Sequence, residues 1–250
     1  MFIDKSADVW EYDGSYYGFL TIVYQAFKQQ RFPEIILTPE TSIESLFLSK
    51  WIETDEILAG KIAARLIKRL RTENMQFIID GFYCSLEEKE ACLLEAIEIG
   101  LKTNDLLINH LGHPAILALQ KSIKALYSEV HLFTGFVRFE YVGNFLYSTI
   151  APKHFSLPYL CPHFAQRYSG ETIVIYDETH RLLALIEKGK ISFIEDADPP
   201  AIDPQETEKN IQENWRVFLQ AVTISERKNE RVQLSHLPKR FRSNMVDFDE

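Results

Sequence analysis

Residues 136–150 read FVRFEYVGNFLYSTI, and this stretch decides the fold that we expect for the second half of the chain. Two runs rich in β-branched and aromatic residues flank Gly143-Asn144, a dipeptide that accepts positive φ angles and so joins antiparallel strands through a two-residue loop. In this register Val142 lies opposite Phe145, and alternate side chains share a face. The expected core face holds Val137, Phe139, Tyr141, Leu146 and Ile150, and the expected polar face holds Arg138, Glu140, Tyr147 and Thr149.

The rest of the chain divides into a helical half and a half with more strands. Apolar residues at helical spacing between capping residues predict helices over 16–29, 55–70, 86–100 and 114–133, with short strands near 10–12 and 35–38. After the hairpin we expect a helix over 158–168, strands over 172–176, 182–187 and 191–195, and a helix over 204–225. This ββαβββα order predicts an α+β fold with an antiparallel sheet and a mostly helical first half. We expect one domain, 1–250, or a division into 1–133 and 134–250.

Composition narrows the function classes. The net charge of −9 argues against a protein that coats duplex nucleic acid through bulk electrostatics. The three cysteines, Cys84, Cys92 and Cys161, show no paired spacing and fit a reducing compartment. No run reaches the ~18 apolar residues of a membrane span. We therefore expect a soluble cytoplasmic protein without a membrane partner.

Two basic segments stand out against this acidic background. Lys61, Arg65 and Lys68 fall at i, i+4 and i+7, so they line one face of the expected helix over 55–70. Residues 223–242 hold six bases and two acids. Both segments fit phosphate-binding surfaces, and both also fit solvated faces that balance acidic neighbours.

A group of acids and histidines offers a candidate catalytic centre. Carboxylates beside imidazoles could perform acid-base chemistry or bind a divalent ion, although hydrogen bonding with a purely structural role also explains them. The candidates are Glu129, His131, His163, Asp177 and Glu178, with His180 nearby. The sequence has no Cys-x3-Cys-x2-Cys cluster, no glycine-rich phosphate loop and no Gly-x-Ser-x-Gly elbow. We therefore expect no cofactor.

Several aromatic and histidine strings carry a resemblance that spans most of the chain. The strings are Trp10-x-Tyr12-Asp13-Gly14-Ser15, Glu129-Val130-His131-x-Phe133-x-Gly135-Phe136, Pro162-His163-Phe164-Ala165-x-Arg167-Tyr168, Ile175-Tyr176-Asp177-Glu178, Arg227-x-Asn229-x-x-x-Gln233 and Leu237-Pro238-x-Arg240. With them the chain resembles a bacterial family associated with DNA metabolism and DNA repair, which has no established reaction. Members of that family look like partners of a radical SAM protein of DNA modification, and some are fused to a uracil-DNA glycosylase-like domain.

The resemblance implies a DNA-repair or DNA-modification accessory protein with DNA and an enzymatic partner. A single strand or exposed nucleotide is held by bases along its phosphates and by aromatic faces. The expected contact residues are Arg138, Arg167, Arg227, Asn229, Gln233, Lys239, Arg240 and Arg242, with His131 and His163 buried nearby. Asn229 and Gln233 fit capping roles equally well. Where the family tail resembles Arg-Tyr-Trp-Lys, this chain reads Arg240-Phe241-Arg242-Ser243 and lacks the tryptophan.

Two alternatives stay open. The first is a metal-assisted or acid-base enzyme acting on nucleic acid, in which the acids and histidines named above converge. The second is a protein-interaction adapter without nucleic-acid contact, which requires a contiguous apolar surface patch.

Overall fold

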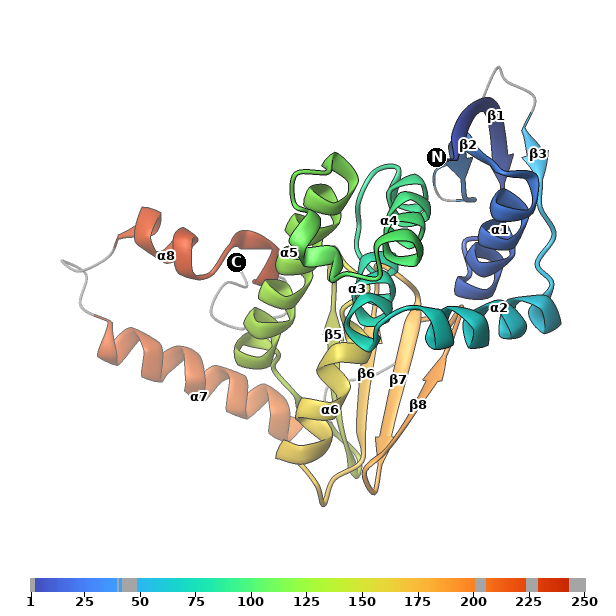
Figure 1. Cartoon of the computed structure of the whole chain (residues 1–250). Coiled ribbons are helices and arrows are strands. Elements are labelled where there is room, and N and C mark those ends of the chain that lie inside the picture. Colours follow the sequence, from blue (N-terminus) through green and yellow to red (C-terminus); the bar gives the residue numbers. More distant parts are fainter. Residues whose placement is uncertain (1–2, 40, 42–48, 201–205, 224–228, 243–250) are drawn as a thin grey trace. The chain divides into compact units, whose positions relative to one another are not determined.

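The computed structural model describes residues 3–39, 41, 49–200, 206–223 and 229–242 (Figure 1). The chain forms two compact units, residues 1–125 and 126–250. Both contain helices and a sheet, so the fold is α+β as expected. No helix within these described ranges is long and apolar enough to cross a membrane.

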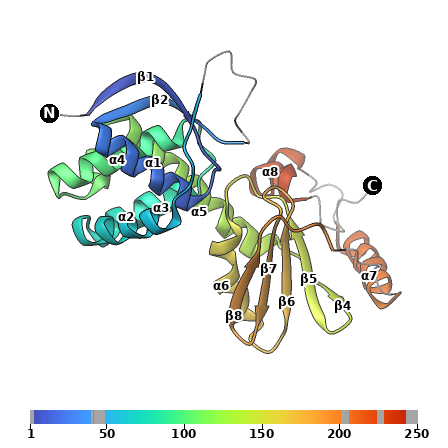
Figure 2. The same cartoon turned by 90° about the vertical axis from the view of Figure 1, so that its right-hand side faces the viewer.

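The first unit is built on a parallel sheet of order β2-β1-β3. The strands are β1 (Asp4–Glu11), β2 (Arg31–Leu37) and β3 (Lys50–Trp51), and helix α1 (Tyr16–Gln29) connects β1 to β2 (Figure 2). The Ser15 hydroxyl accepts a hydrogen bond from the Gly18 N–H at 2.9 Å, which satisfies one of the free amides at the start of α1. The expected strands near 10–12 and 35–38 are therefore longer than predicted, and they are parallel because a helix joins them.

Four further helices and a 3₁₀ turn complete the first unit; the helical periodicity predicts α2, α4 and α5, whereas α3 and the 3₁₀ turn were not predicted. They are α2 (Glu56–Arg69), α3 (Thr72–Phe82), α4 (Lys89–Thr103), η1 (Leu107–His110) and the first half of α5 (Pro114–Phe136). Their apolar faces share one core with the sheet, in which Phe19, Leu94 and Ile97 are fully buried. A polar contact crosses this core, because the buried Tyr12 hydroxyl donates to Oε1 of Glu90 at 2.9 Å.

The second unit contains a five-stranded sheet of order β4-β5-β6-β7-β8. The elements are β4 (Glu140–Val142), β5 (Phe145–Ile150), α6 (Leu157–Arg167), β6 (Ile173–Asp177), β7 (Leu182–Glu187), β8 (Lys190–Ile194), α7 (Glu206–Val222), α8 (Glu230–His236) and η3 (Lys239–Phe241). The expected antiparallel sheet is only partly right. Neighbouring strands are antiparallel except β5 and β6, which run parallel and are joined by α6.

The hairpin has the predicted register but not the predicted length. Val142 pairs with Phe145, and Gly143 has a φ of 61°, as the two-residue loop requires. The first strand begins only at Glu140, because α5 continues to Phe136. The face assignment was wrong for two residues, since Tyr141 is exposed and Tyr147 is buried.

Helix α7 presents apolar side chains outward. Ile211, Trp215, Phe218 and Val222 recur at spacings of four, three and four residues, so they share one face, and each is 42–56% exposed. The Trp215 and Phe218 rings lie 5.5 Å apart. This face does not contribute to the core of the second unit, which is formed by the sheet, α6, the end of α5 and the residues around η3.

Candidate functional site

Polar side chains gather where the parallel strands β5 and β6 end. Ile150 and Asp177, the last residues of the two strands, pair with each other. The loop over 151–156 leads from β5 into α6, and the loop over 178–181 leads from β6 into β7. The carboxyl ends of parallel strands are the usual place for a ligand site in sheets crossed by helices.

Glu129 on α5 organises the first of these loops. Its side chain has no exposed surface, so each carboxylate oxygen needs donors. The backbone N–H groups of Lys153 and His154 donate at 3.0 and 2.9 Å, and the Ser156 hydroxyl donates at 2.6 Å. The buried carboxylate therefore fixes the conformation of the loop over 151–156.

Arg240 supplies the positive charge that Glu129 requires. Its Nη1 lies 2.9 Å from Oε2 of Glu129, while 44% of the arginine side chain stays exposed. The guanidinium lies 4.7 Å from the ring centroid of Phe241, and that ring packs edge-on against Phe133 at 4.8 Å. The buried ring and the buried carboxylate together hold the arginine in one place.

A second buried carboxylate holds a histidine. Asp177 has no exposed surface, and its Oδ1 accepts the backbone N–H groups of Thr179 and His180 at 3.0 and 3.1 Å. Its Oδ2 lies 2.7 Å from Nδ1 of His180. In neutral His180, a proton on Nδ1 donates to Asp177 and leaves Nε2 as the acceptor, which is the tautomer of a general base.

His154 interacts electrostatically with Glu129 and Arg240 of the first pair and with His180 of the second. Burial lowers the pKa of His154; the Glu129 charge opposes that shift, and the positive charges of Lys153 and Arg240 reinforce it, as does a protonated His180. Only 4% of the residue is exposed. The two histidines, Glu129 and Arg240 therefore share one neighbourhood that contains both proton acceptors and fixed positive charge.

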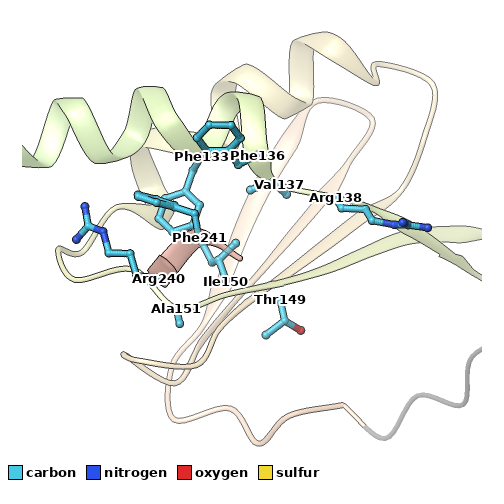
Figure 3. Close-up of a pocket in the computed structure, with 9 residues that line it drawn as sticks. All are labelled: Phe133, Phe136, Val137, Arg138, Thr149, Ile150, Ala151, Arg240 and Phe241. Atoms are coloured by element: carbon cyan, nitrogen blue, oxygen red, sulfur yellow. The ribbon is translucent and has the colours of Figure 1, made fainter. Parts of the chain in front are cut away.

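A small open pocket lies beside this cluster (Figure 3). It is a shallow, open hollow lined by Phe133, Phe136, Val137, Arg138, Thr149, Ile150, Ala151, Arg240 and Phe241. Arg138 and Arg240 border it from opposite sides, with their guanidinium groups directed away from each other. The two guanidinium groups therefore do not converge on one point.

Only part of the predicted acid-histidine group comes together. Glu129 and Asp177 are the two buried carboxylates of the site, whereas Glu178 is exposed. The expectation that His131 and His163 are buried was wrong. Both are exposed, and the His163 ring contacts Phe164. Within the described ranges, no three His, Cys, Asp or Glu side chains are arranged to hold a metal ion, so the predicted convergence on a metal is not found there.

Only some of the residues predicted to contact nucleic acid lie at the pocket. Arg138 and Arg240 line the pocket. Arg167 ends α6 and lies over the Tyr168 ring at 5.5 Å, and Arg242 donates from Nε and Nη2 to the Leu237 carbonyl. Asn229 caps α8 by accepting the Val232 N–H at 3.1 Å. Gln233 and Lys239 are exposed on α8 and η3, and Arg227 lies outside the described residues.

Sequence reasoning missed His154 and Ser156. Both lie in the short segment between β5 and α6, whose only signal is its position after a strand and before a helix. That signal becomes informative once the two flanking strands are known to be parallel, because it then marks the usual ligand edge.

Comparison with known proteins gives one match. The sequence model of a family described as a domain of unknown function, DUF4130, matches residues 87–247 and so covers the whole site. No curated protein and no solved structure matches the chain.

Proposed function

The chain belongs to the DUF4130 family, and we propose that this member is a DNA-repair or DNA-modification accessory protein that binds a single strand or exposed nucleotide through its second unit. It works with an enzymatic partner, for which a radical SAM protein is the candidate. The resemblance described above supports the biological setting. The geometry around Arg240 supports the mode of contact.

The observation that carries the proposal is the fixed, half-exposed Arg240. A guanidinium has five N–H donors, and one nitrogen faces Glu129 while the group still meets solvent beside Arg138 and the pocket. An arginine held in place before binding loses little side-chain entropy when it meets a phosphate. Of the three rings at the pocket, Phe133 and Phe241 are buried, and the half-buried Phe136 is the one that a base can contact.

The test is the salt dependence of DNA binding. Arg138→Gln should weaken binding of a labelled single-stranded oligonucleotide and reduce the slope of log K against log salt by about 0.7. Arg240→Lys keeps the positive charge opposite Glu129 but loses the planar guanidinium with its paired N–H donors. It should therefore weaken binding with little change in slope. Arg181→Gln is the matched control, because Arg181 is exposed in the same unit and pairs with Asp198. Equal slopes for Arg138→Gln and wild type would exclude the pocket as the contact.

The partner contact of this function is assigned to α7. An exposed row with Trp215 and Phe218 at its centre is the pattern of a helix that inserts into an apolar groove of another protein. Ile211→Glu with Phe218→Glu should abolish co-purification with the radical SAM partner and leave oligonucleotide binding unchanged. Asn210→Glu with Asn214→Glu adds two negative charges to α7 at exposed polar positions beside the row and should retain the partner.

Acid-base catalysis on nucleic acid is the second candidate function. The buried Asp177 with Nδ1 of His180 at 2.7 Å favours it, because this contact orients an imidazole as a proton acceptor. Wild-type protein would then convert oligonucleotides carrying uracil, an abasic site or a single-stranded gap, detected by denaturing gels and mass spectrometry. His180→Gln should abolish conversion, and His163→Gln, which changes an exposed histidine, should not. No conversion of any substrate by wild type would exclude this role for the tested lesions.

A further inference from the structure

The outward face of α2 in the first unit carries an uncompensated row of bases. Lys61, Arg65 and Lys68 are exposed, and Arg69 beside them is exposed as well. None of the four forms an ion pair with a carboxylate of the described residues. In a chain whose net charge is −9, such a row is unusual, since acids are in excess elsewhere.

Packing fixes the direction in which this row points. The opposite side of α2 is apolar, and Ala59, Ile62 and Leu66 are buried in the core of the first unit. The spacing of four and three residues keeps Lys61, Arg65 and Lys68 on one side, about 6 and 4.5 Å apart along the axis. The bases cannot turn inward without exposing the core.

The helix dipole does not account for the whole row. Cations are favoured in the last turn of a helix, which explains Lys68 and Arg69. Arg65 and Lys61 lie about one and two turns earlier, where the dipole contributes little. The acids at the other end of α2 have a separate role, because Asp55 accepts the Leu58 N–H at 2.9 Å as the N-cap.

We propose that the Lys61–Arg65–Lys68 face of α2 binds the phosphate backbone of a nucleic acid, as a second contact separate from the pocket of the second unit. A straight row of exposed cations at regular spacing matches a polymer with one negative charge per residue. An anionic membrane fits less well, because a helix that lies on a bilayer needs a free apolar face, and that of α2 is buried. The exposed Ile57 and Ile67 share one side of α2 with the exposed Gly60 and Ala64, but only the two isoleucines on that side are large apolar side chains, about 15 Å apart along the axis.

This inference rests on the proposed function, and the experiment separates the two. The full chain is titrated against a labelled single-stranded oligonucleotide at several salt concentrations. The variant K61Q/R65Q/K68Q should reduce the slope of log K against log salt by about 2, which is three contacts at about 0.7 each. Folding should be unaffected, because the three side chains are exposed and glutamine has a helix propensity like that of lysine and arginine.

The matched control is K28Q/K121Q/K190Q, which removes three exposed bases from α1, α5 and β8. A slope equal to that of the α2 variant would overturn the inference, since net charge alone would then explain the change. A second outcome is a slope of log K against log salt that falls in the α2 variant and stays unchanged in Arg138→Gln. That result would support the α2 contact and refute DNA contact by the pocket. An unchanged slope in the α2 variant alone would refute this inference and leave the pocket standing. If wild type binds phosphatidylserine vesicles through these residues but no DNA, both proposals are wrong.

Discussion

Oε2 of Glu129, on α5, lies 2.9 Å from Nη1 of Arg240, which is 111 positions later in the chain. The carboxylate has no exposed surface, whereas the arginine is 44% exposed. The pair therefore joins the inside of the second unit to its surface. Glu129 also fixes the conformation of the loop over 151–156. A substitution of Arg240 should therefore alter this loop, and a change in the loop should alter the position of Arg240.

Glu129→Gln should destabilise the second unit by about 3 kcal/mol. The amide removes the charge opposite Arg240 and turns an N–H donor toward groups that are themselves donors. Urea unfolding followed by circular dichroism measures the loss. Glu178→Gln, at an exposed acid of the same unit, should cost less than about 0.5 kcal/mol. A double variant with Arg240→Met should recover part of the loss, and no recovery would show that the charge pair is not its cause.

Phe241→Ala should cost about 3 kcal/mol and should also weaken DNA binding. The ring is 5% exposed and packs against Phe133 and Phe136, so its removal leaves a cavity beside the pocket. It also removes the surface under Arg240. Phe193→Ala, at a half-exposed ring on the edge strand β8, is the control for loss of an aromatic side chain. Equal destabilisation of both variants would contradict the packing role assigned to Phe241.

Gly18→Ala and Gly60→Ala should have opposite effects on stability. A Cβ at Gly18 would overlap the Asp13 carboxylate and lie 2.7 and 2.8 Å from side-chain atoms of Tyr12 and Thr54, so alanine should cost about 1–3 kcal/mol. A Cβ at Gly60 on α2 meets nothing within 4 Å, so alanine should stabilise the helix by about 0.5–1 kcal/mol. Thermal melts of the two variants beside wild type give both signs in one experiment.

The stability of the second unit should fall as the pH drops below about 6.5. Burial lowers the pKa of His154 from its ordinary value of 6.5, so below that pH the unfolded chain binds a proton that the folded unit excludes. Above pH 6.5 both states are neutral at this position and the effect vanishes. His154→Gln should flatten the dependence of the unfolding free energy on pH below about 6.5. An equal slope in wild type and His154→Gln would assign the dependence to other groups.

Local chemistry made part of this structure predictable. The Gly143-Asn144 loop sets the Val142–Phe145 register, because a two-residue loop that begins with a glycine at positive φ suffices to reverse an antiparallel pair. Ser15 and Asp55 mark the helix starts where the structure has them, since capping depends on neighbours three residues away. These features involve contacts close in sequence.

The parallel pairing of β5 and β6 was not predictable in the same way. Both strands are short and apolar, and their direction depends on how α6 returns the chain across the sheet. Without knowledge of that pairing, no sequence pattern indicated that Asp177 lies beside the loop that contains His154. Glu129 and Arg240 were each selected for their charge, but their contact at 2.9 Å arises only when η3 docks against α5.

The DUF4130 match begins at residue 87, inside the first unit and just before α4. Leu93, Leu94 and Ile97 of α4 are fully buried in a core that also includes Trp10, Phe19 and other residues of the segment before the match. A polypeptide trimmed to the matched segment would therefore present that leucine-rich side of α4 to water and tend to aggregate. The family match begins inside the first unit, so its boundary is not a boundary of the folded structure. Biochemical work should therefore begin with all 250 residues.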